Sequence, residues 1–203
     1  CKEVITYEPT DQAATKTIAA YDCGIKNNII RSFLKRGVRV HRLPWDYDLQ
    51  NSDLKYDGLF MSNGPGDPKQ CQATIDQIKW ALDQQIPTFG ICLGTQLLAL
   101  AIGGDTYKLK YGHRGCNQPC VEHDEQGKET DKCIITSQNH GFAVDQKALP
   151  DGWKVWFTNA NDDTVEGIRH DTQPFMAVQF HPEATPGPED ADYLFDVFLE
   201  VLK

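Results

Sequence analysis

Cys92 lies between two glycines in the segment GICLG, where two apolar runs meet. The spacing glycine–x–nucleophile–x–glycine is typical of a sharp turn from a strand into a helix, in which the glycines avoid clashes. A sulfur at a helix N-terminus faces unpaired backbone N–H groups and the positive end of the helix dipole, which favour the thiolate. The sequence therefore predicts a nucleophilic cysteine, although a buried cysteine more often only fills a core.

His181 and Glu183 follow the apolar segment 175–180. A thiolate needs a base to accept its proton, and the base needs a group that orients it. Two residues that are two positions apart on an extended chain point to the same side. We therefore expect Glu183 to hold the imidazole of His181, as the third member of a catalytic triad does. Taken alone, His181 would be a surface histidine at a strand end.

The loop SNGPGDP, residues 62–68, contains Gly64 and Gly66, which would let the backbone approach a ligand closely. On its own this loop is an ordinary turn rich in glycine and proline. It gains weight because the carboxyl ends of parallel strands converge on one crevice. Cys92 and His181 are expected at such ends too, so the three segments predict one site.

The first half of the chain alternates apolar strands with helices, whereas the second half contains short strands joined by turns. This alternation predicts an α/β fold with a mostly parallel central sheet flanked by helices, a nucleophile elbow, and a smaller antiparallel strand region in the second half. Strands are expected over 17–22, 38–43, 58–63, 87–91, 106–111, 133–137, 153–159, 165–169 and 175–180. Helices are expected over 28–36, 73–84 and 93–103, with a last one beginning near Pro188.

The length and charge of the chain limit its class. A chain of 203 residues supports one sizeable core, and we expect a tail or linker over 1–14 followed by one domain over 15–203. With 20 basic and 29 acidic residues the net charge is -9, and no basic patch occurs, so neither nucleic acid nor a membrane is an expected partner. Seven scattered cysteines argue against a disulfide framework and favour a reducing, cytoplasmic location.

The motifs GICLGTQ, QFHPE and SNGPGDP together resemble those of the class I, or triad, glutamine amidotransferases. Three more segments, over 110–119, 136–145 and 181–190, are similar to the glutaminase domain of carbamoyl phosphate synthetase of the small-subunit type. The resemblance covers the chain from about Thr17 onward. It implies hydrolysis of L-glutamine to glutamate and ammonia through a Cys-His-Glu triad and a glutamyl thioester. It also implies that the ammonia goes to a carbamoyl phosphate synthetase.

By this resemblance Cys92 is the nucleophile, His181 the base and Glu183 its orienting carboxylate. The backbone of Gly64 and Leu93 would stabilise the oxyanion. The resemblance also implies contacts with the substrate, from Gly64, Gly66, Leu93, Gln96, Asn139, Gly141 and Phe142. Thr95 stands where the common motif has histidine, a difference expected to change the chemistry little.

The resemblance also predicts the partners of the domain. No metal or organic cofactor is expected in it, because ATP and bicarbonate would be used by the synthetase partner, whether that is a fused domain or a separate chain. The small subunits of this family carry an N-terminal domain before the glutaminase. We expect that domain to be missing here, which would affect the glutamine pocket.

Several alternatives share some of these features. The same glutaminase could serve anthranilate, GMP or CTP synthesis, the same triad could hydrolyse γ-glutamyl peptides, or the domain could be an inactive scaffold. A zinc-binding interaction module is suggested by the pattern H-x2-C-x3-C-x2-H, formed by His113, Cys116, Cys120 and His123. That pattern lacks the long spacer usual in zinc fingers, and a core of this size does not need a metal to fold.

Overall fold

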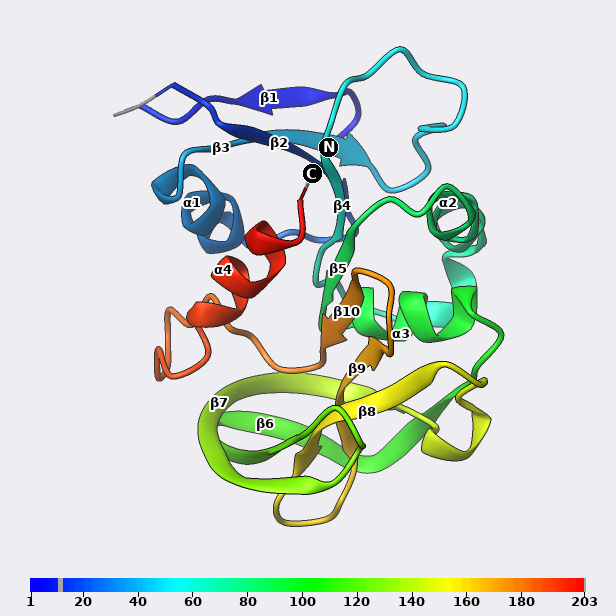
Figure 1. The fold of residues 1–203 in the computed structure, drawn as a ribbon, viewed down its shortest axis with the longest axis vertical. Helices are drawn as coiled ribbons and strands as arrows, with labels where there is room; N and C mark the ends of the chain where they lie inside the picture. Colours follow the sequence, from blue (N-terminus) through cyan, green and yellow to red (C-terminus); the bar gives the residue numbers. More distant parts are fainter. Residues whose placement is uncertain (11–12, 203) are drawn as a thin grey trace.

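Five parallel strands form the centre of the computed structural model, which describes residues 1–10 and 13–202 (Figure 1). In spatial order they are β3 (Val38–Pro44), β2 (Lys16–Asp22), β4 (Gly58–Met61), β5 (Thr88–Ile91) and β10 (Phe175–Val178). Every residue of β4, β5 and β10 is buried. Strands that are covered on both faces read as continuous apolar runs, and this is why the sequence shows them clearly.

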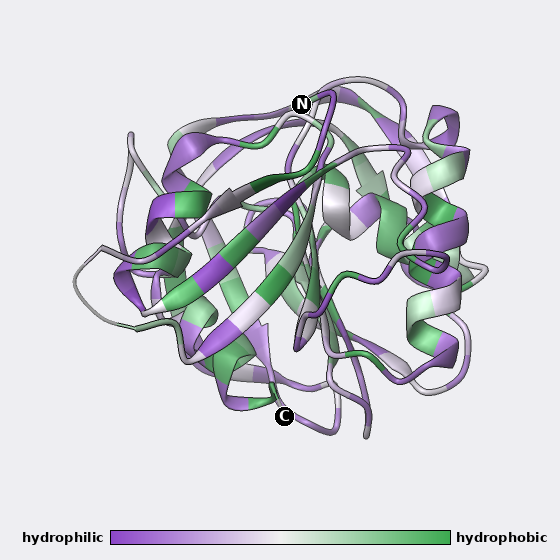
Figure 2. Ribbon diagram, turned by 90° about the horizontal axis from the view of Figure 1, so that it is seen from above, coloured by the Kyte–Doolittle hydropathy of each residue, from purple (hydrophilic) through white to green (hydrophobic). Residues whose placement is uncertain are grey.

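Four helices cover the two faces of this sheet. Helices α1 (Asn27–Lys35) and α4 (Tyr193–Glu200) lie on one side, and α2 (Gln72–Asp83) and α3 (Leu93–Ala101) on the other (Figure 1). Hydropathy colouring shows hydrophobic and hydrophilic bands alternating along the helices (Figure 2). Such a pattern buries one face of a helix against the sheet, whereas in α3 every residue except Leu100 is buried.

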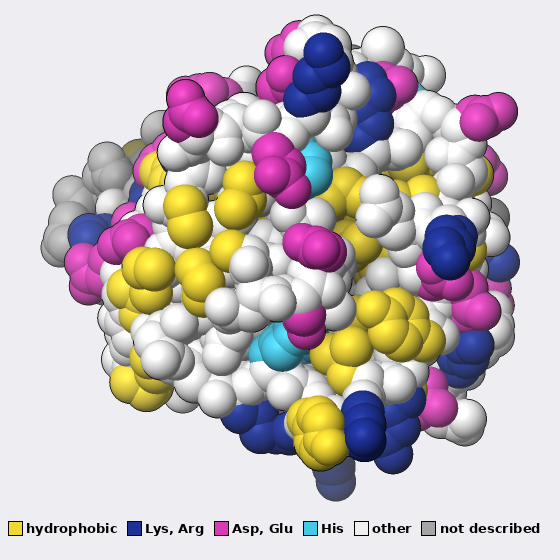
Figure 3. All heavy atoms as spheres, turned by 90° about the horizontal axis from the view of Figure 1, so that it is seen from below, with side chains coloured by type: hydrophobic (Ala, Val, Ile, Leu, Met, Phe, Trp, Pro, Cys, Tyr) yellow, Lys and Arg dark blue, Asp and Glu magenta, His cyan; other side chains and the backbone are white. Residues whose placement is uncertain are grey.

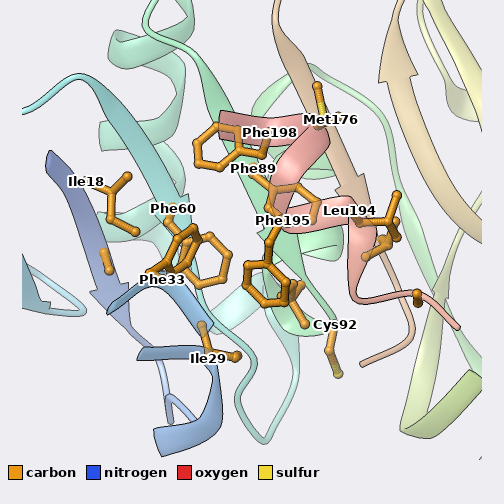
Figure 4. Close-up of a cluster of buried hydrophobic side chains, with 14 of the residues drawn as sticks. Ile18, Ile29, Phe33, Phe60, Phe89, Cys92, Met176, Leu194, Phe195 and Phe198 are labelled. Atoms are coloured by element: carbon orange, nitrogen blue, oxygen red, sulfur yellow. The ribbon is translucent and has the colours of Figure 1, made fainter. Parts of the chain in front are cut away.

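Two hydrophobic clusters fill the spaces between the sheet and its helices. In the cluster under α1 and α4, the rings of Phe33 and Phe195 meet edge to face with centroids 5.0 Å apart. Phe60, Phe89 and Phe198 extend this aromatic group (Figure 4). Buried aromatic pairs of this kind contribute about 0.5–1.5 kcal/mol each beyond the area they bury.

The second half of the chain extends the sheet with antiparallel strands. These are β6 (Thr106–His123), β7 (Glu129–Val144), β8 (Trp153–Asn159) and β9 (Val165–His170), while β1 (Ile5–Tyr7) pairs antiparallel with β3 at the other edge. Of the ten strand pairings within the described residues, only four are parallel. The prediction of a mostly parallel sheet is therefore wrong. After α3 the chain returns through hairpins, and strands joined by a hairpin pair antiparallel.

Strands β6 and β7 are far longer than the short strands expected over 106–111 and 133–137. They span 18 and 16 residues and pair with three register shifts. Each shift breaks the two-residue alternation of side chains between faces, so the sequence loses the pattern that marks a strand.

The last helix begins at Tyr193, not near Pro188 as expected. Two acidic residues before this helix have partners far away in the sequence. Asp190 accepts a hydrogen bond from the backbone N of Ile135, and Asp192 forms an ion pair with Arg36. The short helices η1 (Pro68–Gln70) and η2 (Gln146–Ala148) complete the fold.

The expected tail, 1–14, contains strand β1, while residues 11–12 and 203 lie outside the described part of the chain. The domain boundary at residue 15 stays a prediction. Within the described residues, none of the helices combines the length and the apolar character that crossing a bilayer requires.

Gly94 provides a test of how tightly α3 packs on the sheet. A Cβ at Gly94 would lie 2.3 Å from the carbonyl oxygen of Met61, so Gly94→Ala must displace backbone. We expect a loss of about 3 kcal/mol or more in the free energy of unfolding, measured by urea denaturation. The control is Gly103→Ala, where φ is +88° and no atom lies within 4 Å of the added Cβ. That variant should lose only about 1–2 kcal/mol. Equal losses would contradict the predicted clash.

Candidate active site

Cys92 occupies the turn between β5 and α3, with φ 56° and ψ -104°. This conformation is unfavourable for a residue with a side chain. Such strain persists only where the packing of the surrounding structure enforces it. A Cβ at Gly90 would lie 2.8 Å from the carbonyl carbon of Gly94, so only glycine fits this bend. The Val178 carbonyl anchors the turn by accepting from Cys92 N at 2.9 Å and Thr95 Oγ1 at 2.6 Å. The expected elbow is present, and Cys92 lies at the margin of the aromatic cluster (Figure 4).

His181 and Glu183 form the expected contact, with 2.8 Å between His181 Nδ1 and Glu183 Oε1. The reasoning from an extended chain was wrong, however. Ala184 N donates to the His181 carbonyl at 3.2 Å, so these residues form a tight turn. His181 N also donates to the Ser137 carbonyl at 2.9 Å, which ties the turn to β7. The turn and this second strand together hold the imidazole in place.

The electrostatic environment favours a charged imidazole at position 181. Burial lowers the pKa of His181, but hydrogen bonds with Cys92 and Glu183 outweigh burial and raise the pKa to about 10. The Glu183 side chain is fully buried, so no water screens its attraction for the imidazolium. A proton is therefore held between the sulfur and the carboxylate at neutral pH.

Cys92 and His181 line the same cavity, which has a volume of about 400 Å³. The wall of this cavity comes from segments that are distant in the sequence: Gly24, Asn63, Gly64, Pro65, Cys92, Asn139 and His181. A second hollow of about 340 Å³ shares Asn63, Asn139 and His181. Three of the loops at the carboxyl edge of the parallel sheet thus meet at one place, as the sequence predicts.

Five other expected site residues are not among those that line this cavity: Gly66, Leu93, Gln96, Gly141 and Phe142. Leu93 begins α3, whose first N–H groups have no acceptor within the helix. Gln96, one turn further on, is buried, and its Nε2 donates to the Phe142 carbonyl at 3.0 Å. Gly141 precedes Phe142 on β7. Gly66 is exposed, and no heavy atom lies within 4 Å of where its Cβ would be. The roles of these residues stay predictions.

The loop after β2 and the start of α1 also contribute to the site, although neither was predicted to do so. Lys26 Nζ lies 3.4 Å from Glu183 Oε1, and Asn28 Nδ2 donates to the Glu183 carbonyl. Lys26 N also donates to Asn63 Oδ1 at 3.0 Å, which joins this loop to the glycine loop. The sequence contained the information needed to predict this, because the loop follows the carboxyl end of a parallel strand, as the other loops of the site do.

The four residues of the suggested zinc pattern have separate partners. Cys120 is buried beside Thr136, His123 Nε2 contacts Thr158 Oγ1, and Cys116 is exposed. Among the described residues, the ligand-type side chains that come together are instead His113, His140 and Glu166.

His113 lies between two carboxylates, at 3.0 Å from Glu166 Oε1 and 2.9 Å from Asp162 Oδ2. The hydrogen bond with Glu166 raises the pKa of His113; although burial lowers it, the contact with Asp162 adds to the increase, and the pKa reaches about 9. Metal ligands must be deprotonated, so a histidine that is charged at neutral pH favours an ion-pair network over a metal site.

The fold and site together define a class: an α/β domain with a cysteine at a strand–helix elbow that faces a histidine–glutamate pair. The family model for glutamine amidotransferase class-I matches residues 19–201. The chain belongs to this family.

The chain is also similar to individual known proteins. The chain is 52% identical over 201 residues to the multifunctional protein CAD of Squalus acanthias, covering 98% of this chain and 8% of that protein. It is 49% identical over 187 residues to the carbamoyl phosphate synthase arginine-specific small chain of Aspergillus oryzae, covering 92% of this chain and 40% of that one. A putative GMP synthase subunit from Thermoplasma acidophilum has a similar fold, with a TM-score of 0.78 and 25% identity over 93% of this chain and 94% of that chain.

The strain at the elbow should be measurable. Cys92 has φ 56°, so Cys92→Gly should unfold at higher urea concentration than Cys92→Ala, which keeps a Cβ in the same conformation. We expect a difference of about 1–2 kcal/mol in the free energy of unfolding. The same pair of substitutions at Cys120, which lies within strand β6, should show the reverse order, because glycine weakens a strand. A Cys92→Gly variant less stable than Cys92→Ala would contradict a strained turn.

The His113 ion pairs should make stability depend on pH. The pKa of His113 is raised from 6.5 to about 9, so its stabilisation is complete below pH 6.5 and is lost as the pH rises through about 9. We expect His113→Gln to lose about 2 kcal/mol near pH 6 and much less near pH 10, measured by urea unfolding. Glu166, Asp162 and the ring of His140 face this group. A loss that is constant across this range would contradict the assignment.

Proposed function

We propose that this domain hydrolyses L-glutamine to glutamate and ammonia, and that the ammonia serves a carbamoyl phosphate synthetase. The observation that carries the proposal is the shared cavity of Cys92 and His181, together with the 2.8 Å contact between His181 and the buried Glu183. A nucleophile, a base and a group that orients the base are the parts that acyl transfer requires.

In the proposed reaction the Cys92 thiolate attacks the side-chain amide carbon of glutamine. The C–N bond then breaks, and the imidazolium of His181 gives its proton to the departing nitrogen, because an amide nitrogen leaves poorly without one. The raised pKa of His181, about 10, supports this role as an acid. Water then loses a proton to His181 and attacks the glutamyl thioester, which releases glutamate and restores the thiolate.

The oxyanion of each tetrahedral intermediate needs donors already in place. We assign this role to the backbone N–H of Leu93, at the first turn of α3, and to the backbone of the Gly64 loop. A Cβ at Gly64 would lie 2.1 Å from the Cys23 carbonyl oxygen, so this loop is held tightly against the loop after β2. We assign glutamine binding to Gly66, Gln96, Asn139, Gly141 and Phe142.

The ammonia acceptor is inferred from the relatives that this chain matches. The chain spans 8% of the multifunctional protein CAD and 40% of the small chain of a carbamoyl phosphate synthase. We therefore propose that a synthetase domain or subunit that uses ATP and bicarbonate works with this domain, and that the domain itself uses no metal or organic cofactor. Supply of ammonia for GMP synthesis is the second candidate, because a putative GMP synthase subunit shares the fold, but at 25% identity.

Replacement of the nucleophile tests the proposal in the intact enzyme with its synthetase. We expect Cys92→Ser to lower glutamine-dependent synthesis of carbamoyl phosphate by about 10³-fold or more, because a serine hydroxyl here is a far weaker nucleophile. Synthesis from added ammonia should stay within about twofold, because it bypasses the thioester. The control is Cys133→Ser, an exposed cysteine on β7, which should change neither rate. Survival of the glutamine-dependent rate in Cys92→Ser would refute the proposal.

A further inference from the structure

Glu166 and Gln179 each bury a polar atom that has no hydrogen-bond partner within the described residues. The atoms are Glu166 Oε2, an acceptor, and Gln179 Nε2, a donor, and they are two of only four such atoms in the described part of the chain. Both residues are fully buried. A buried polar group left without a partner costs about 1–3 kcal/mol, so a donor and an acceptor at neighbouring positions would each gain by pairing with the other.

The backbone places these two residues side by side. Gln179 N donates to the Glu166 carbonyl at 2.8 Å, which continues the β9–β10 ladder one residue beyond the Val178–Gly167 pair. Residues directly opposite in an antiparallel ladder point to the same face, with Cβ atoms about 5 Å apart. A rotation of the Glu166 side chain, or one bridging water, would join Gln179 Nε2 to Glu166 Oε2 and keep the contact of Gln179 with Gln96.

The other end of Gln179 contacts an expected glutamine-binding residue. Gln179 Oε1 and the Phe142 carbonyl both lie 3.0 Å from Gln96 Nε2. A carbonyl can only accept, so the Gln96 atom beside Phe142 is the nitrogen, and Gln179 must present its oxygen to that nitrogen. Gln96 is thereby fixed in one orientation, which leaves its Oε1 for a ligand.

The two groups that accept from Gln96 Nε2, the Phe142 carbonyl and Gln179 Oε1, both lie in the surroundings of Glu166. The Phe142 carbonyl also accepts from His140 Nδ1 at 2.8 Å. His140 Nε2 lies 3.0 Å from Gln138 Oε1, its hydrogen-bond partner, and 3.6 Å from Glu166 Oε1, which is close enough for a charge interaction only. The charge of Glu166 is balanced by His113, which Asp162 contacts from the outside. This end of the molecule, formed by β6 to β9, shows histidine at the surface close to acidic side chains (Figure 3).

We infer that Glu166, paired with His113, is a positioning residue for the substrate: through Gln179 it fixes the orientation in which Gln96 meets glutamine. This inference rests on the proposed function. Gln96 would hold a part of glutamine that does not react. Its contact would therefore be equally strong in the bound substrate and in the transition state. Disturbing its orientation should therefore raise KM for glutamine and leave kcat nearly unchanged.

An exchange of the two side chains tests the link in the intact enzyme. Gln179→Glu alone sets a second carboxylate against Glu166 in a buried site, which is unfavourable. The double variant Glu166→Gln with Gln179→Glu restores one carboxylate and one amide in the reverse order. We expect the single variant to raise KM for glutamine about tenfold or more, with kcat within about threefold, and the double variant to recover most of that KM. Glu122→Gln on β6, which loses an ion pair with Lys132 elsewhere on the sheet, is the matched control and should keep the wild-type KM.

Two results would overturn the inference: a wild-type KM in the single variant, or a double variant no better than the single one. If Gln179→Glu does not fold, the shape-conserving variants Gln179→Met and Glu166→Gln replace it, and each should raise KM while ammonia-dependent synthesis is unchanged. An unaltered KM in both of these variants would also overturn it.

Labelling of Cys92 separates this inference from the proposed function. A chloroketone analogue of glutamine should label wild-type Cys92 with saturation, whereas iodoacetamide, which does not resemble glutamine, needs only the sulfur. If the chloroketone does not label wild-type Cys92, the proposed function fails. If it does, Gln179→Glu should need about tenfold more chloroketone for half-maximal labelling, while its iodoacetamide rate stays within about threefold. If wild type and variant needed the same chloroketone concentration for half-maximal labelling, the positioning role would be refuted and the proposed function would stand.

Discussion

The close approach of two backbone segments at Gly90 and Gly94 is the constraint on which the rest of the site depends. The strand β5 must turn directly into α3, and a Cβ at Gly90 would lie 2.8 Å from Gly94. This bend forces Cys92 to φ 56° and directs its side chain to the edge of the sheet. Strain of this kind persists only because the packing around it is stronger, and here both faces of the sheet are filled by buried clusters.

The end of β10 and the residues just after it connect the elbow, the histidine and Gln96. The Val178 carbonyl accepts from Cys92 N, Gln179 contacts Gln96, and His181 N donates to the Ser137 carbonyl. Because these contacts all come from within four positions, 178 to 181, one strand end sets the geometry of the nucleophile, the base and Gln96 together. At the base, burial lowers the pKa of His181, but the hydrogen bonds with Cys92 and Glu183 outweigh burial and raise the pKa to about 10.

Local patterns predicted the buried parallel strands and the elbow well, because strands covered on both faces and a turn that excludes side chains leave strong marks in a sequence. They failed where the chain is partly exposed. The long hairpin of β6 and β7 contains three register shifts, so its alternation is lost, and the sheet was wrongly expected to be mostly parallel. The start of the last helix was misplaced because Asp190 and Asp192 have partners far away in the sequence.

The sequence by itself determined the chemical groups: a cysteine between two glycines, and a histidine with a glutamate two residues later. It also determined the family, through motifs whose spacing is local. Only the tertiary structure decided that Lys26 lies beside Glu183, that His181 and Glu183 meet through a turn, and that Glu166 is buried opposite Gln179. Those contacts join residues on different strands and loops, and their distances depend on how the whole sheet pairs and twists, which no local pattern encodes.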